Sequence, residues 1–185
     1  MISGDQGAGK TTLLRALIAE IPPNERFGTL ETDYELLTHL QPGRRNMLAL
    51  QAKMGLGEQQ GDRHVGEWSV ADLIPEALRQ NLARLVVGEV RGKEALTLVD
   101  AWSTGHRGGC STVHSDSAYD TLFRLEDLVS RVSVSSQQAG IARAIDVIVY
   151  IERRAVSRTI AEVLSIDGWD RERHDYMTHR LDAEI

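Results

Sequence analysis

A glycine-rich segment at the start of the chain has the residue types and spacing of a phosphate-binding loop (P-loop). Residues 4–11 read GDQGAGKT, which matches the pattern G-x-x-x-x-G-K-[ST] in full. Small residues let backbone N–H groups turn inward around phosphates, and the helix that follows directs its positive end at them. We expect Lys10 to reach the β- and γ-phosphates and the Thr11 hydroxyl to ligate Mg²⁺. The predicted nucleotide-binding residues are Gly4, Asp5, Gln6, Gly7, Ala8, Gly9, Lys10, Thr11 and Thr12.

The surroundings of this loop favour a real phosphate site over a chance match to the pattern. Residues 11–20 have the apolar spacing of an amphipathic helix, which Pro22 and Pro23 end. The apolar residues Met1 and Ile2 precede the loop as the stub of a strand. Since such a strand normally has several apolar residues, we expect it to be truncated at its start.

Nucleotide hydrolysis also needs a carboxylate that organises the metal ion or polarises water. Glu89 closes a short apolar run, and in a parallel sheet the ligand lies beyond the carboxyl ends of the strands. We therefore expect Glu89 to organise the metal ion or to polarise water, rather than only to pair with Arg91 or Lys93. Glu31 closes an earlier apolar run in the same way. From the residues alone, a catalytic role and a solvated turn are equally good interpretations of Glu31.

Two histidines frame a second glycine-rich segment. His106 and His114 flank Gly105, Gly108 and Gly109. Two histidines without nearby cysteine or carboxylate partners are a weak indication of a metal site. A structural role, or a hydrogen bond to phosphate, is the alternative interpretation.

Composition limits the kind of protein that this sequence encodes. The 185 residues suffice for one packed domain, and 42% apolar with 26% charged residues is an ordinary globular mixture. The net charge of −6 argues against a nucleic-acid surface that depends on positive charge. Cys110 is the only cysteine, which excludes an internal disulfide and a cysteine-based metal site. With no apolar run of membrane-spanning length and no signal peptide, a cytoplasmic location is expected.

Strand and helix patterns alternate along the chain, which predicts an α/β sheet covered by helices. Ser69 and Asp72 form a potential capping box before one of these helices. A domain is expected over residues 1–167, followed by a polar tail at 168–185. Helices are predicted at 11–20, 70–82, 93–102, 117–132 and 135–144, and strands at 27–31, 47–52, 85–90, 110–114, 146–151 and 159–166.

Four segments together resemble the ATPases of type II and type IV secretion, conjugal transfer and tight-adherence pili (CpaF-like). Other P-loop classes rarely combine the segment LVVGEVRG at residues 85–92 with the segment TGHRGGCSTVH at residues 104–114. Two departures are an acidic box that reads Glu31-Thr32-Asp33 instead of the usual EDT, and Leu82-Ala83 in place of a Pro-Asp pair. The segments are the Walker A loop at residues 4–12, the acidic box at 29–36, the Walker B segment LVVGEVRG at 85–92 and the histidine box TGHRGGCSTVH at 104–114.

The resemblance implies a RecA-like P-loop domain with a mostly parallel sheet, which hydrolyses ATP with Mg²⁺. It implies that Glu31 orients the attacking water and that Glu89 acts on Mg²⁺ directly or through water. His106 and His114 would sense the γ-phosphate, and Arg91 would hold the Walker B segment in place. It implies, too, that the family's N-terminal domain, which closes over the nucleotide, is absent from this sequence.

The resemblance also implies a ring, usually a homohexamer, in which arginines reach across subunit contacts, with Arg79 and Arg84 as candidates. Its partners would be inner-membrane secretion or pilus platform proteins, which would hold it at the inner face of the membrane without direct nucleic-acid binding. Two alternatives stay open. One is a nucleic-acid-stimulated P-loop motor, which the acidic balance disfavours, and the other is a chain that binds nucleotide without turnover.

Overall fold

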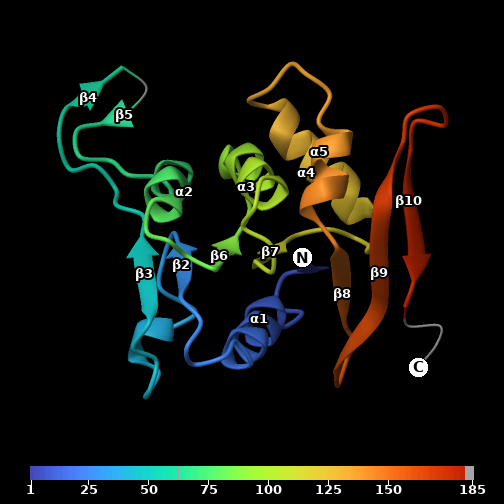
Figure 1. Cartoon of the computed structure of the whole chain (residues 1–185), viewed down its shortest axis with the longest axis horizontal. Helices are drawn as coiled ribbons and strands as arrows, with labels where there is room; N and C mark the ends of the chain where they lie inside the picture. Colours follow the sequence, from blue (N-terminus) through green and yellow to red (C-terminus); the bar gives the residue numbers. More distant parts are fainter. Residues whose placement is uncertain (62, 182–185) are drawn as a thin grey trace.

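An eight-stranded sheet runs through the molecule in the strand order β10-β9-β8-β1-β7-β6-β2-β3 (Figure 1). The structure, a computed structural model of the whole chain, describes residues 1–61 and 63–181. A separate two-stranded hairpin joins β4 (Gln59–Gln60) to β5 (Arg63–His64). The strands of the large sheet are β1 (Ile2–Gly4), β2 (Phe27–Glu31), β3 (Met47–Gln51), β6 (Arg84–Glu89), β7 (Cys110–Val113), β8 (Val147–Arg153), β9 (Arg158–Asp170) and β10 (Asp175–Arg180).

The sheet is mostly parallel. β1 pairs in parallel with β7 and β8, β6 with β7 and β2, and β2 with β3. β9 runs antiparallel to β8, and β10 antiparallel to β9. Because the parallel strands point the same way, the residues that follow them gather at one side of the sheet, which we call the carboxyl edge. The P-loop follows β1 at this edge.

Helices cover both faces of the sheet (Figure 1). On one face, α1 (Lys10–Ala19) buries Leu14 and Ile18 against Phe27 of β2. β6 lies between the two layers, and its central residues 85–87 are fully buried, which explains their continuous apolar run. The other face is covered by α2 (Val70–Leu78), α3 (Glu94–Ser103), α4 (Asp120–Ser130) and α5 (Gln138–Ala144), while a short 3₁₀ helix, η1 (Thr38–Leu40), follows β2.

The predicted α/β fold is confirmed, and most boundaries agree with those expected to within a few residues. The helix expected at 70–82 ends at Leu78, because Asn81 takes a left-handed conformation (φ 53°) in the turn before β6. The expected capping box is present, since the backbone N–H of Ser69 donates to Asp72 Oδ2 at 2.8 Å. Among the described residues, no helix is long and apolar enough to cross a lipid bilayer.

The polar segment after residue 167 continues the sheet. β9 extends to Asp170, and β10 pairs with it. Two aromatic side chains anchor this hairpin, because Trp169 and Tyr176 meet edge to face with ring centroids 4.9 Å apart. The Tyr176 hydroxyl also donates to Glu126 Oε1 of α4 at 2.8 Å. Residues 182–185 of the expected tail lie outside the described residues.

Candidate active site

The P-loop joins the end of β1 to the start of α1 in a conformation that needs glycine. Gly4 has a φ of 143°, and a β-carbon added there would lie 2.2 Å from the carbonyl oxygen of Ile151 on β8. Gly9 has a φ of 100° and stands immediately before the first residue of α1. Both backbone angles are unfavourable for residues with a side chain. The backbone conformation alone therefore explains why glycine stands at these two positions of the motif.

Lys10 extends back across the loop that precedes it. Its Nζ donates to the carbonyl oxygens of Gly4 and Asp5, both at 2.8 Å, and lies 3.1 Å from His114 Nδ1. Burial lowers the pKa of Lys10, and the negative charge of Glu89 opposes that effect. The ammonium group is thus held at the loop, where a phosphate would replace its carbonyl partners.

A cavity of about 780 Å³ opens over the P-loop and contains most of the residues predicted from the sequence. Its walls come from the loop itself, from α1, and from the first residues of β9. Asp5, Glu31 and His106 are the predicted site residues besides Gly4 that do not line it. The lining includes residues 6–13, together with Glu35, Glu89, Arg91, His114 and Arg158.

Glu89 and His114 meet at the carboxyl edge. β6 has a bulge at Gly88, whose carbonyl accepts a hydrogen bond from the Thr112 hydroxyl at 2.8 Å. Beyond the bulge, Glu89 Oε2 pairs with the Arg91 guanidinium. Its Oε1 lies 3.0 Å from His114 Nε2, off the line of a hydrogen bond, so Oε1 has no hydrogen-bond partner among the described residues. His114 therefore stands between Lys10 and the predicted metal-binding carboxylate.

Glu31 lies in a second, smaller cavity of about 110 Å³, which shares Thr11, Glu35 and Glu89 with the larger one. Only 3% of Glu31 is exposed, and this burial raises the pKa of its carboxyl group. Its Oε1 accepts the backbone N–H groups of Glu35 at 2.9 Å and Leu36 at 2.8 Å. Its Oε2 is buried without a hydrogen-bond partner among the described residues. A buried carboxylate oxygen with no partner is a group available to water or a cation.

These residues fit an Mg²⁺ ion that arrives with a nucleotide. No group of three acidic, histidine or cysteine side chains among the described residues forms a metal cage. Mg²⁺ in nucleotide sites takes few protein ligands and completes its shell with phosphate oxygens and water. Thr11 Oγ1 lies 3.4 Å from Glu35 Oε2, and Glu89 Oε1 contacts His114 but accepts no hydrogen bond among the described residues. Thr11 Oγ1 and Glu89 Oε1 are suitable ligands at the loop.

His106 and His114 lie at opposite ends of β7. His114 follows the strand at the carboxyl edge, whereas His106 precedes it. The loop of His106 lies beside the start of β6, because Arg84 Nη1 donates to the carbonyl of Gly108 at 3.1 Å. His106 Nδ1 is buried without a hydrogen-bond partner among the described residues. The structure does not bring His106 to the P-loop within this chain, and its role as a phosphate sensor stays a prediction.

Arg79 and Arg84, the two arginines considered for contacts between subunits, differ in how firmly their side chains are held within the chain. Arg84 Nη2 donates to Glu25 Oε2 at 3.2 Å, in addition to its bond with Gly108, so its guanidinium is held within the chain. Arg79 lies 3.5 Å from Glu76, and 75% of its side chain is exposed. Of the two, Arg79 has the more exposed side chain, since 34% of the Arg84 side chain is exposed.

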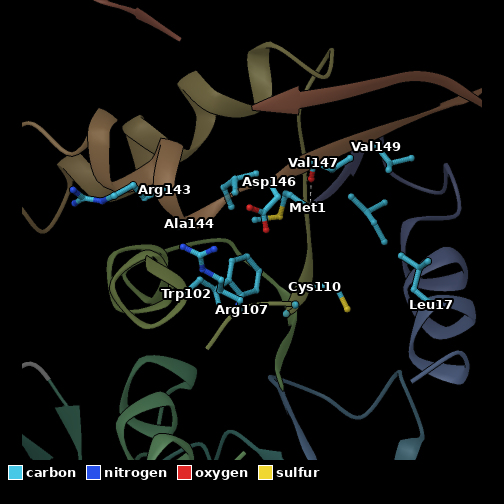
Figure 2. A pocket seen from close by; sticks show the side chains of 14 residues that line it. Met1, Leu17, Trp102, Arg107, Cys110, Arg143, Ala144, Asp146, Val147 and Val149 are labelled. Carbon is cyan, nitrogen blue, oxygen red and sulfur yellow. Dashed lines mark hydrogen bonds between the residues drawn. The ribbon is translucent and has the colours of Figure 1, made fainter. Parts of the chain in front are cut away.

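A further cavity of about 290 Å³ opens at the end of the sheet opposite the carboxyl edge, where the parallel strands begin (Figure 2). Arg107, Cys110 and Asp146 line it, and the amino group of Met1 donates to the carbonyl of Val147 at 2.7 Å. Burial raises the pKa of Cys110 to about 11. None of the residues 4–12 lines this cavity, so the chemistry of the P-loop belongs to the carboxyl edge alone.

The profile of the family described as Type II/IV secretion system protein matches residues 1–172. The chain belongs to this family.

Relatives within the type II/IV secretion family include proteins of conjugation and of type IV secretion. The conjugal transfer protein TrbB of Rhizobium radiobacter is 37% identical over all of this chain and 53% of its own length. The type IV secretion system protein PtlH of Bordetella pertussis is 34% identical over 91% of this chain and 50% of its own length. This chain therefore spans about half the length of the curated relatives that it matches.

A solved structure supports the same assignment of the fold. The VirB11 ATPase from the Brucella suis type IV secretion system, in complex with sulphate, superimposes with a TM-score of 0.72 and 26% identity. The match covers 88% of this chain and 46% of that protein. The mostly parallel sheet with helices on both faces is thus the fold of a secretion-family ATPase domain.

Two charged residues that hydrogen-bond to the P-loop segment, Glu35 and Arg158, were not among the predicted site residues. Glu35 reaches Thr11 from the acidic segment after β2, and a signal was present in the sequence, since it stands four residues after Glu31. Arg158 donates from Nε to the carbonyl of Gly7 at 3.1 Å. Because 151 residues separate Arg158 from Gly7, no local pattern could have indicated this contact.

Proposed function

We propose that this chain is the ATP-hydrolysing motor domain of a type II/IV secretion, pilus-assembly or conjugation machine. The observation that carries this proposal is the series of contacts from Lys10 through His114 to Glu89 beside the P-loop. These contacts connect the residue that would bind the γ-phosphate to the residue that would hold the metal ion. The names of the relatives support the class of machine.

Each residue around the loop has a separate task in the proposed reaction. The P-loop N–H groups and Lys10 bind the phosphates, and Thr11 and Glu89 hold Mg²⁺. The metal ion, when bound, neutralises charge that develops on the phosphate oxygens. Arg91 fixes Glu89 in place through their ion pair.

Glu31 is the candidate for orienting the attacking water. Its raised pKa makes it a stronger base than an exposed carboxylate, and its Oε2 is free of other hydrogen bonds among the described residues. The water oxygen attacks the γ-phosphorus, the bond to the β-γ bridging oxygen breaks, and ADP leaves with the bond electrons. Glu31 accepts the proton of the water, directly or after it has passed to phosphate.

The assembly belongs to the same proposal. Loss of the γ-phosphate would change the contacts of Lys10 and His114, and neighbouring subunits of a homohexamer would respond through residues at their contacts. His106 and Arg79 are candidates for that role. Membrane platform proteins at the inner face of the membrane would be the partners that the motor drives.

Phosphate release from Mg-ATP tests the proposal directly. We expect turnover in the unsubstituted chain, loss of turnover with retained ATP binding in Glu89→Gln, and loss of binding in Lys10→Ala. Equal rates in Glu89→Gln and the unsubstituted chain would contradict the assignment of Glu89. ATP binding without turnover in the unsubstituted chain would show a nucleotide-binding chain that needs further parts to hydrolyse. A rate that depends on added DNA would favour the nucleic-acid-stimulated motor instead.

A further inference from the structure

The β8–β9 hairpin extends past the end of β1 and lies against the P-loop. β1 and β8 are paired in parallel with Gly4 beside Ile151, so β8 continues to Arg153 at the level where β1 has already turned into the loop. The chain then reverses through a turn in which the Arg154 N–H donates to the Ser157 carbonyl at 2.9 Å. In Figure 1 the joined ends of β8 and β9 lie at the bottom, on the same side as α1.

Two arginines of this hairpin stand over glycines of the loop. Arg153 and Arg158 face each other across the strand pair. A β-carbon on Gly7 would lie 3.3 Å from Arg153 Nη1, and one on Gly9 would lie 3.1 Å from Arg158 Cδ. Arg158 lines the same cavity as Lys10. Two positive charges thus approach the phosphate loop from outside the motif.

Neither arginine is neutralised by a carboxylate within the part of the chain that the structure describes. Among the described residues, Arg153 and Arg158 form no ion pair, whereas Arg154 in the turn between them pairs with Glu152 at 3.1 Å. Arg158 uses Nε to donate to Gly7, a neutral carbonyl of the loop. Lys10 is bonded in the same way to Gly4 and Asp5. Both cations are therefore held beside the loop by carbonyls that compete poorly with a phosphate.

We propose that Arg158 is a phosphate-binding residue of the nucleotide site, which moves from the Gly7 carbonyl to the diphosphate shared by ADP and ATP. Arg158 donates to Gly7 and lies against Gly9, whereas His114 contacts Lys10 and Glu89. Arg158 is therefore assigned to the part of the nucleotide that remains after hydrolysis, and His114 and Glu89 to the end that carries the γ-phosphate. This inference rests on the proposed function, because it concerns the same site.

Equilibrium binding of ADP, ATP and inorganic pyrophosphate tests the proposal. Titrations use chains that also carry Glu89→Gln, so that ATP is not consumed. We expect Arg158→Gln to raise the Kd of ADP and of ATP by the same factor, roughly tenfold, as for one lost charge-assisted hydrogen bond. Pyrophosphate should compete less well by a similar factor, and Arg158→Lys should recover part of the affinity. Arg154→Gln, in the same hairpin, is the matched control and should change the Kd less than twofold.

Several outcomes would overturn the proposal. An unchanged Kd in Arg158→Gln would show that the guanidinium does not bind phosphate, and a loss confined to ATP would place it at the γ-phosphate instead. An equal loss in Arg154→Gln would indicate a general effect of charge. If the chain with intact arginines binds neither nucleotide, the proposed function and this inference both fail. If it binds and the unsubstituted chain hydrolyses ATP, an unchanged Arg158→Gln overturns this inference alone.

Discussion

Glu31 fills the space that a side chain at position 88 would need. A β-carbon built on Gly88 would lie 3.1 Å from Glu31 Cγ and 3.6 Å from its Oε1. The glycine of the segment LVVGEVRG therefore allows a carboxylate from the neighbouring strand β2 to approach. One acid at the end of β6 and one at the end of β2 then face the same loop.

Gly88→Ala should reduce turnover more than nucleotide binding. The added methyl group would push Glu31 away from its backbone partners, and small displacements of a catalytic group have large effects on rate. We expect phosphate release to fall roughly tenfold or more, while the Kd of ATP changes less than threefold. Gly92→Ala, whose β-carbon would meet only the flexible end of Glu94, is the control and should retain its rate. A Gly88→Ala chain with an unchanged rate would refute the packing argument.

Glu31→Gln should stabilise the protein at neutral pH while it removes activity. The pKa of Glu31 is raised in the folded chain, so its favourable contribution is complete below the ordinary carboxyl pKa and disappears as pH rises through the folded value. Glutamine keeps an acceptor for the two N–H groups and does not ionise. We expect the Tm of the variant to exceed that of the unsubstituted chain by a few degrees at pH 8, with the difference shrinking towards pH 4. A difference that grows on acidification would contradict the sign of the shift.

Arg44→Ala should destabilise α1. The Arg44 guanidinium donates to the carbonyls of Ile18, Ala19 and Ile21, at 3.0, 2.6 and 2.5 Å, and so caps the end of the helix that carries the P-loop. Loss of such bonds costs about 1–2 kcal/mol, or roughly 2–8 °C in Tm for a domain of this size. Thermal unfolding followed by circular dichroism measures the change. The adjacent exposed Arg45→Ala is the control, and a similar loss there would argue against capping.

Cys110 should be unreactive in the folded chain. Burial raises its pKa to about 11, so very little thiolate is present at pH 8. We expect alkylation to be slower than for a free cysteine by a factor on the order of a hundred, and to become fast in denaturant. Labelling kinetics followed by mass spectrometry measure both rates. Rapid labelling without denaturant would show that β7 opens far more readily than its place in the central sheet indicates.

The sequence predicted the parts of the fold and the site that depend on local pattern. The P-loop was predicted from its glycine spacing, and the structure shows that the backbone angles at Gly4 and Gly9 require glycine. Glu89 was predicted from its place at the end of a buried strand. His106 and His114 lie only eight residues apart in the sequence, but β7 runs between them, so they lie at opposite ends of this strand. β10 was missed because its residues are mostly polar and its one aromatic residue, Tyr176, packs on Trp169 of β9 only in the folded chain. Arg158 was missed because its contact with Gly7 exists only after β8 has paired with β1.

β9 begins over the P-loop and ends far from it. Its thirteen residues, at about 3.3 Å each, span roughly 40 Å, from Arg158 to Asp170 beyond the point where the parallel strands begin. The first part of this strand, residues 158–165, pairs with β8, and its last part, residues 164–170, pairs with β10. Tyr176 connects the outer hairpin to α4. A tilt of the β8–β9 hairpin towards bound phosphate would therefore also displace the far end of β9. Trp169, Tyr176 and the surface between α4 and α5 would move with it.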